Sequence, residues 1–151
     1  MIEIRDYTSN YRSDFKSLNM QWIEQYFTVE PSDASMLEDP ESHIIERGGH
    51  IFVAVDDDAV LGVCSLVPAS PGSFQLAKMA VSPEARGRGI GRMLGNAAVE
   101  RARSVGASSV ELYSNTVLAP AISLYESLGF REVPLEGAEH VRSNIRMVLR
   151  F

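Results

Sequence analysis

The sequence predicts an α/β (α+β) domain with a mixed, mostly antiparallel central sheet of about seven strands, flanked by about four helices. Two observations predict this class. Strand-like apolar runs alternate with segments of helical periodicity. A short acidic turn joins two apolar runs, which is typical of a hairpin. The expected order of elements is β-α-α-β-β-β-α-β-α-β-β.

The N-terminal part is expected to form one strand and two helices. Residues 2 to 4 alternate between apolar and charged side chains, which predicts a first strand. Apolar residues at helical spacing predict an amphipathic helix from Asn10 to Tyr26. Pro31 breaks the chain, and Ser32 and Asp33 are expected to cap a short second helix.

The next segment is predicted to be a further helical turn followed by a hairpin. The turn would run from Glu41 to Arg47 and end at the glycines 48 and 49. Two apolar runs, 51–55 and 60–67, flank the acidic turn 56–59. The three adjacent aspartates of this turn lack the alternating ligands, central glycine and distal Glu of a calcium loop, so we expect a solvated turn.

The C-terminal half is expected to alternate strands and helices, bounded by glycines and prolines. Pro120 is well suited to the first turn of a helix because that turn needs no N–H group from it. The predicted elements are a strand at 75–81, a helix at 90–106, a strand at 109–113, a helix at 120–129, and strands at 130–133 and 145–151.

Length and composition limit the classes of protein that remain. A chain of 151 residues is long enough for one domain with a real core, so we expect residues 1–151 to form a single domain. The net charge of −6 argues against a nucleic-acid partner. The sequence has no apolar run of membrane-spanning length and no signal-peptide layout, and its one cysteine, Cys64, lies in an apolar run. We therefore expect no membrane partner and a cytoplasmic location.

The most informative motif is the stretch Arg86-Gly87-Arg88-Gly89-Ile90-Gly91, between a predicted strand and a predicted helix. Glycines let the backbone turn tightly and approach a ligand. The first amides of a helix have no internal partner and lie at the positive end of its dipole. This combination predicts a phosphate site, and Arg86, Arg88 and Arg92 add positive charge to it.

With these residues in place, the sequence resembles the GNAT superfamily of acyl-CoA-dependent N-acyltransferases. The resemblance covers nearly the whole chain in element order and is specific in two blocks. The first block, from Met79 to Gly91, is similar to that family's acyl-CoA loop. The second runs from Asn115 through Ala121 to Phe130.

The resemblance implies a coenzyme A site on the first block. Backbone amides from Arg86 to Arg92 would hold the pyrophosphate, and the strand edge at Met79 and Val81 would pair with the pantetheine arm. An amide near Met79 or Ala80 would polarise the thioester carbonyl. The residues assigned to coenzyme binding are Met79, Ala80, Val81, Arg86, Gly87, Arg88, Gly89, Ile90, Gly91, Arg92, Asn115 and Tyr125.

The resemblance also implies two catalytic residues, Tyr125 and Asn115. Tyr125 would protonate the departing thiolate of coenzyme A, because a tyrosine with an ordinary pKa near ~10 keeps its proton at neutral pH. Asn115 would lie near the pantetheine and the acyl group. From the residues alone, Tyr125 also fits a core aromatic residue and Asn115 a turn residue.

The sequence departs from the family pattern at the general base. Many relatives carry a glutamate where this chain has Gln75, and a neutral amide cannot accept the proton of the amine. Glu111, Glu24 and His140 are the candidates, and a chain of solvent molecules is an equal alternative. The segment 142–147 is expected to border the acceptor pocket.

The expected function is transfer of an acetyl group from acetyl-CoA to a primary amine in a ternary complex, without a metal. An alternative is a non-catalytic acyl-CoA-binding module of the same fold. A remote alternative is a dinucleotide-binding oxidoreductase, since Gly89-Ile90-Gly91 followed by Gly95 resembles a loose fingerprint, with Glu111 as the ribose-binding acid. The resemblance also allows a homodimer through the edge of the last strand.

Overall fold

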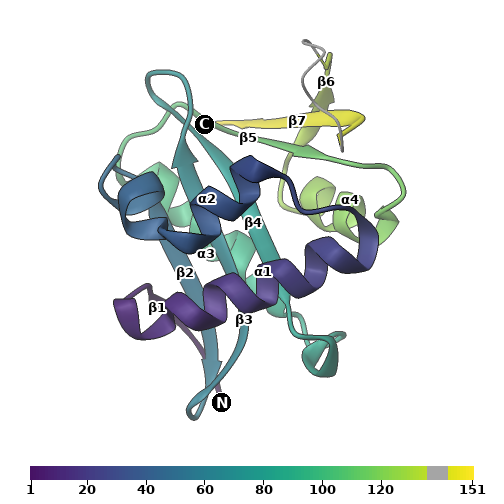
Figure 1. Ribbon diagram of the computed structural model, residues 1–151. Coiled ribbons are helices and arrows are strands. Elements are labelled where there is room, and N and C mark those ends of the chain that lie inside the picture. The colour runs from purple at the N-terminus through teal and green to yellow at the C-terminus, as the bar shows by residue number, and fades with distance from the viewer. Residues whose placement is uncertain (136–142) are drawn as a thin grey trace.

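A seven-stranded sheet forms the centre of the computed structural model, which describes residues 1–135 and 143–151 (Figure 1). The strand order is β1-β2-β3-β4-β5-β7-β6. Neighbouring strands are antiparallel except β4 and β5, which are parallel. The strands are β1 (Ile2–Asp6), β2 (His50–Asp56), β3 (Ala59–Pro68), β4 (Ser73–Val81), β5 (Ser109–Ser114), β6 (Arg131–Val133) and β7 (Ile145–Arg150). The predicted fold class and order of elements are confirmed.

Helices cover both faces of this sheet. Figure 1 shows α1 and α2 in front of the strands and α3 behind them. The α-helices are α1 (Arg12–Tyr26), α2 (Pro31–Glu38), α3 (Ile90–Ser104) and α4 (Ala119–Ser127). The described residues also form three short helical segments: the 3-10 helices η1 (Ser9–Tyr11) and η3 (Pro83–Ala85), and the π-helix η2 (Glu41–Ile45).

Strand β2 divides the core into two parts because its side chains alternate between the faces of the sheet. Ile51, Val53 and Val55 pack with residues of α1 and α2 in one cluster. Phe52 and Ala54 pack with residues of α3 in the other. Both faces are covered at β2 and β3, which explains why these two strands read as continuous apolar runs in the sequence.

The sheet splits between β4 and β5. These two strands pair only from Ser73 with Ser109 to Gln75 with Glu111. Beyond that point β4 continues along β3 as far as Val81, while β5 continues along β7. In Figure 1, β5 and β7 cross the view at a steep angle to β4. The split leaves one edge of β4 without a neighbouring strand in the described part of the chain.

The start of α2 differs from the sequence prediction. Ser32 and Asp33 were expected as caps, but the N-cap is Glu30 and Pro31 is the first helical residue. Proline fits this position because its fixed φ suits the helix and its missing N–H is not needed there. Asp33 instead forms the other half of a capping box, since its Oδ2 accepts a hydrogen bond of 3.1 Å from the Glu30 N–H.

The dinucleotide-binding alternative does not match this topology. A sheet of that kind is built from repeated parallel β-α-β units. Here β4 and β5 are the one parallel pair among the strands of residues 1–135 and 143–151. Glu111, the supposed ribose-binding residue, lies within β5 beside Gln75.

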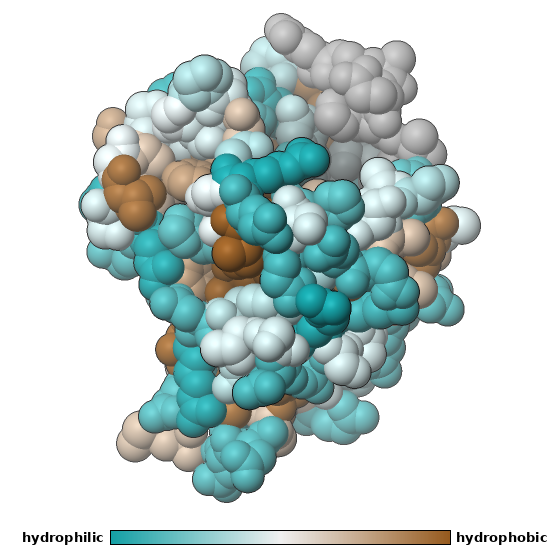
Figure 2. All heavy atoms as spheres, turned by 60° about the vertical axis from the view of Figure 1, so that its left-hand side comes forward, coloured by the Kyte–Doolittle hydropathy of each residue, from teal (hydrophilic) through white to brown (hydrophobic). Residues whose placement is uncertain are grey.

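The surface and the helices carry little continuous apolar character in the view of Figure 2 and in the described residues. On the face drawn in Figure 2, apolar residues form small separate areas between hydrophilic ones. Within the described residues, no helix is long and apolar enough to cross a bilayer. Cys64 is fully buried on β3, as its place in an apolar run predicted.

Candidate functional site

A cavity of about 190 Å³ opens where β4 and β5 separate. Its walls come from α1 and the chain after it, from β4 and β5, from α4 with the turn before it, and from Ser143. Met79, Asn115 and Tyr125, which the sequence assigned to one site, all line it, and so does Gln75. The folding of the chain therefore brings together residues that are far apart in the sequence.

Strand β4 carries a bulge at this cavity. Ala77 pairs with Ser65 and Ala80 with Val63, so two residues of β4, Lys78 and Met79, lie opposite the single residue Cys64. Lys78 has a φ of 54°, in the left-handed region that side chains other than glycine rarely adopt. Bulges turn the strand locally and change where its backbone groups point. Ala77, Lys78 and Met79 all line the cavity beside this bulge.

The glycine loop lies between β4 and α3 and has the geometry that its sequence predicts. Gly87 and Gly89 have φ values of 82° and 77°, which a residue with a side chain would adopt only under strain. Gly89 is the N-cap of α3 and supplies no side chain to the first amides of the helix. The loop is exposed at both glycines, and no side chain caps the helix start that follows them.

The loop and the cavity meet at Gly91. A Cβ atom added to Gly91 would lie 3.2 Å from Cδ2 of Leu124 and 4.0 Å from Sδ of Met79. Leu124 precedes Tyr125 on α4, and Met79 lines the cavity. The start of α3, the end of β4 and helix α4 therefore converge on one place.

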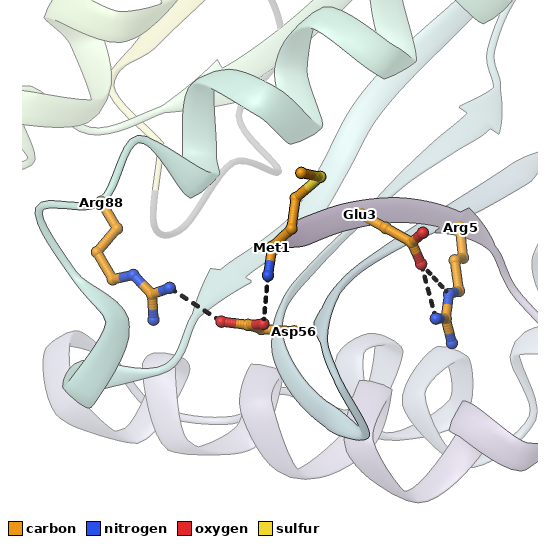
Figure 3. A network of polar contacts seen from close by, with 5 residues as sticks. All are labelled: Met1, Glu3, Arg5, Asp56 and Arg88. Carbon is orange, nitrogen blue, oxygen red and sulfur yellow. Dashed lines mark hydrogen bonds and ion pairs between the residues drawn. The ribbon is translucent and has the colours of Figure 1, made fainter.

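The arginines of the loop already have polar partners. Arg86 donates a hydrogen bond of 2.9 Å to Oε1 of Gln25 on α1. Figure 3 shows Arg88 directed at Asp56, at a distance of 3.2 Å, and the N-terminal ammonium of Met1 at the other oxygen of the same carboxylate. These cations lower the pKa of Asp56, mainly through the N-terminal hydrogen bond. The loop is thus tethered to α1 and to the β2–β3 hairpin.

The more distant arginines of α3 do not belong to this site. Arg101 pairs with Asp6 at 2.8 Å, and Arg103 pairs with Glu100. Both lie in the last turn of α3, where positive charge complements the helix dipole. Arg92, by contrast, is exposed in the first turn of the helix.

Tyr125 lies on α4 with its ring edge against Phe130, at a centroid distance of 6.2 Å. Burial raises the pKa of its hydroxyl to about 12, because the phenolate form would lose hydration there. The hydroxyl therefore keeps its proton through the whole physiological range. Tyr125 is both a packed aromatic residue and a wall of the cavity.

Asn115 closes the turn between β5 and α4. Its Oδ1 accepts a hydrogen bond of 2.9 Å from the Val117 N–H, and its carbonyl accepts one of 2.9 Å from Leu118. Asn144, which precedes β7, fixes the same turn through Thr116. Asn115 is therefore a turn residue and also part of the cavity wall.

The candidate general bases lie outside the cavity or outside the described residues. Glu111 shares its carboxylate between Arg146, at 3.6 Å, and the Tyr113 hydroxyl, at 3.5 Å. Glu24 is exposed on α1. His140 and Arg142 fall outside the described residues. Within the described residues, the cavity wall contains no Asp, Glu or His.

Sequence reasoning missed a buried ion pair at the bulge. Lys78 Nζ lies 2.5 Å from Oδ1 of Asp33, whose side chain is 1% exposed. The signal was a single lysine inside the apolar strand Leu76–Val81, where a charged residue requires a partner.

In the described part of the chain, no three His, Cys, Asp or Glu side chains are arranged to hold a metal ion.

Comparison with known proteins shows the same fold and family. The model of the acetyltransferase (GNAT) domain matches residues 47–132. An uncharacterized N-acetyltransferase of Bacillus subtilis, YvbK, is 28% identical over 66% of this chain and 66% of its own length. Across the first curated relatives, the matched region spans 43% to 66% of the relative's length.

Solved structures with the same fold align with nearly the whole of this chain. A GNAT-family acetyltransferase of Staphylococcus aureus Mu50 aligns with a TM-score of 0.87 and 19% identity, covering 99% of both chains. PaiA N-acetyltransferase of Thermoplasma acidophilum, solved with coenzyme A, aligns with a TM-score of 0.76 and 18% identity over 100% of this chain and 99% of its own.

Proposed function

Because the chain belongs to the GNAT family of acetyltransferases, we propose that residues 1–151 act as one domain that transfers an acetyl group from acetyl-CoA to a primary amine. One observation carries the proposal. Past Gln75, one edge of β4 has no strand partner among the described residues, and it leads from the cavity that Tyr125 lines to the exposed glycine loop. An extended thioester with a pyrophosphate at one end matches this succession of sites.

The residues present suit coenzyme A at both ends. The uncapped amides at the start of α3, with Gly87 and Gly89 in left-handed conformations, provide donors for a pyrophosphate. The β4 edge from Leu76 to Val81 has backbone groups without a strand partner among the described residues, and these can pair with the amides of a pantetheine arm. We assign the pyrophosphate to residues 86–92 and the arm to Met79–Val81.

Acetyl-CoA supplies the activated acyl group, and the chain supplies an oxyanion donor and an acid. As the amine nitrogen bonds to the carbonyl carbon, negative charge grows on the carbonyl oxygen, and an amide of the bulge near Met79 or Ala80 stabilises it. When the carbon–sulfur bond breaks, Tyr125 donates its hydroxyl proton to the sulfur and regains one from solvent. Asn115 shapes the turn beside these groups.

We assign the proton of the attacking amine to solvent. Gln75 lines the cavity but can only orient a water molecule. Glu111 is engaged by Arg146 and Tyr113. The fraction of amine that is unprotonated then sets the rate, so turnover should rise with pH until the amine is fully deprotonated.

The absence of an acidic residue from the described cavity wall also favours a second function, a module that binds acyl-CoA without turnover. The two functions predict the same ligand and differ in catalysis. In both functions the protein binds coenzyme A thioesters, and the catalytic function also requires an amine substrate.

The first test is thermal stability against acetyl-CoA, coenzyme A and NADH. A ligand at about 100 times its Kd stabilises the native state by roughly 2.7 kcal/mol, which raises the Tm by several degrees at roughly 2–4 °C per kcal/mol. We expect a concentration-dependent rise with both coenzyme A species and none with NADH. No rise with either coenzyme A species would refute the proposal.

A further inference from the structure

A nearly buried ion pair connects helix α2 with the β4 bulge. Lys78 Nζ and Asp33 Oδ1 are 2.5 Å apart, and the side chains are 15% and 1% exposed. Exposed ion pairs hold geometry weakly, but a carboxylate this deeply buried cannot lose its partner without a large cost. The pair therefore acts as a firm link between the two elements.

The link ends on a strained residue. Lys78 is in the left-handed region with a φ of 54°, and it is one of the two bulge residues opposite Cys64. Such conformations persist only where the surroundings enforce them, and they gather at functional sites. On the other side of Lys78, the buried Ser65 hydroxyl donates a hydrogen bond of 2.8 Å to the Ala77 carbonyl. Two side-chain contacts thus flank the strained backbone.

Asp33 itself is firmly placed. Its second oxygen, Oδ2, accepts the Glu30 N–H and so closes the first turn of α2. One carboxylate therefore fixes the start of a helix and, through Lys78, the bulge that lines the cavity. The ammonium of Lys78 is committed to this carboxylate, so its role toward a ligand runs through the backbone.

We propose that Lys78 is a positioning residue, whose ion pair with Asp33 holds the β4 bulge in the conformation that binds the acetyl carbonyl. The proposal rests on the proposed function, since it takes acetyl-CoA as the ligand of the cavity. It adds a residue whose side chain is held by Asp33 and acts on the ligand only through the bulge backbone. The bulge backbone contacts the acetyl group, and Lys78 keeps that backbone in place.

The test compares affinities for acetyl-CoA and coenzyme A, which differ only in the acetyl group. Calorimetry gives both Kd values for the wild type and for Lys78→Met, Lys78→Gly and Lys78→Arg. We expect Lys78→Met to weaken acetyl-CoA binding by about tenfold, the size of one lost hydrogen bond, and to leave coenzyme A binding unchanged. Lys78→Gly should retain most of the preference because glycine adopts a positive φ without strain. Lys78→Arg should restore part of it.

The matched control is Lys16→Met. Lys16 forms an ion pair of 2.7 Å with Glu38 of α2, but the two side chains are 43% and 64% exposed. This variant should bind both ligands like the wild type. If Lys78→Met does not fold, the double variant with Asp33→Asn removes the unpaired buried charge and should show the same loss of preference.

The outcomes separate the two proposals. An unchanged preference in the foldable variant that lacks the Lys78 charge would overturn the positioning role, even if the wild type acetylates amines. A loss in Lys78→Gly as large as in Lys78→Met would also overturn it, because relief of the backbone strain would then fail to restore the acetyl preference. If the wild type binds neither coenzyme species, the proposed function fails and the positioning role fails with it.

Discussion

Replacing Tyr125 by Phe removes one hydroxyl group and retains the ring that packs against Phe130. The hydroxyl is the acid of the proposed reaction, so the substitution should affect the chemical step and spare coenzyme binding. Removal of a general acid lowers turnover by about 10²–10⁴-fold. We expect kcat to fall within this range, with the KM for acetyl-CoA changed by less than about threefold.

The pKa of Tyr125 sets two further magnitudes. With a pKa raised from 10.0 to about 12, about one hydroxyl in a thousand is ionised at pH 9, so the acid should cause no alkaline fall in wild-type kcat up to that pH. The raised pKa also affects stability. The contribution of the protonated hydroxyl to the free energy of unfolding is complete below pH 10 and is lost as the pH rises through about 12. The free energy of unfolding should fall by roughly 3 kcal/mol over this interval. The Phe variant should lack that alkaline loss.

The assay is initial-rate release of coenzyme A with a reactive amine at saturating acetyl-CoA, from pH 6 to pH 9. Tyr11→Phe is the matched control, because Tyr11 accepts a hydrogen bond of 3.2 Å from Arg5 and lies away from the cavity wall. Equal kcat values for wild type and Tyr125→Phe across this range would refute Tyr125 as the acid.

Three other predictions follow from particular residues. Gly89→Ala and Gly48→Ala both place a side chain at a positive φ with open space around it, so each should lower the free energy of unfolding by about 1–2 kcal/mol. Calorimetry should show weaker acetyl-CoA binding only for Gly89→Ala. Equal binding by both variants would contradict the assignment of the glycine loop. Burial raises the pKa of the Cys64 thiol, so a thiol reagent at pH 8 should label it only after denaturation, and rapid labelling of the native protein would show that β3 is accessible. Phe15→Ala leaves a cavity at a fully buried position of α1 and should lower the free energy of unfolding by about 3–5 kcal/mol, seen as a fall in Tm of roughly 6–20 °C. A smaller fall would mean that neighbouring side chains fill the cavity and that Phe15 is not essential to the core.

Much of the fold was predictable because it rests on local patterns. The periodicity of 10–26 predicted α1, which begins two residues later, and the acidic turn predicted the β2–β3 hairpin. The predicted start of α2 was wrong, because Glu30 is the N-cap and Asp33 completes the capping box from the third helical position. Local patterns state that an element exists, and its boundary depends on side-chain hydrogen bonds that the pattern does not contain.

The split between β4 and β5 was not predictable in the same way. Both segments read as ordinary strands, and nothing in their alternation states that pairing stops at Gln75 and Glu111. Strand partners are chosen by packing between distant parts of the chain. The bulge at Lys78 was not predicted for the same reason, since the residue with the positive φ pairs with Asp33, 45 residues earlier in the chain.

The candidate site was predicted in its parts. Tyr125, Asn115 and Met79 were assigned from the resemblance, and the structure brings them to one cavity; their roles in catalysis and binding remain predictions. The base candidates Glu111 and Glu24 do not reach that cavity wall. A glutamate in a sequence shows that a proton acceptor exists, but its ion pairs decide whether it is available, and Arg146 engages Glu111.

The central claim is acetyl transfer to an amine, and its most direct measurement is the mass of the amine after incubation with acetyl-CoA and the protein. A panel of small amines, peptide α-amines and lysine peptides would be incubated with the wild type, with Tyr125→Phe, and without protein. We predict at least one acceptor that gains a single acetyl group and releases an equal amount of coenzyme A, faster with the wild type than with Tyr125→Phe. Binding of acetyl-CoA with no acetylated amine in any class would contradict the account and identify a coenzyme-binding module instead.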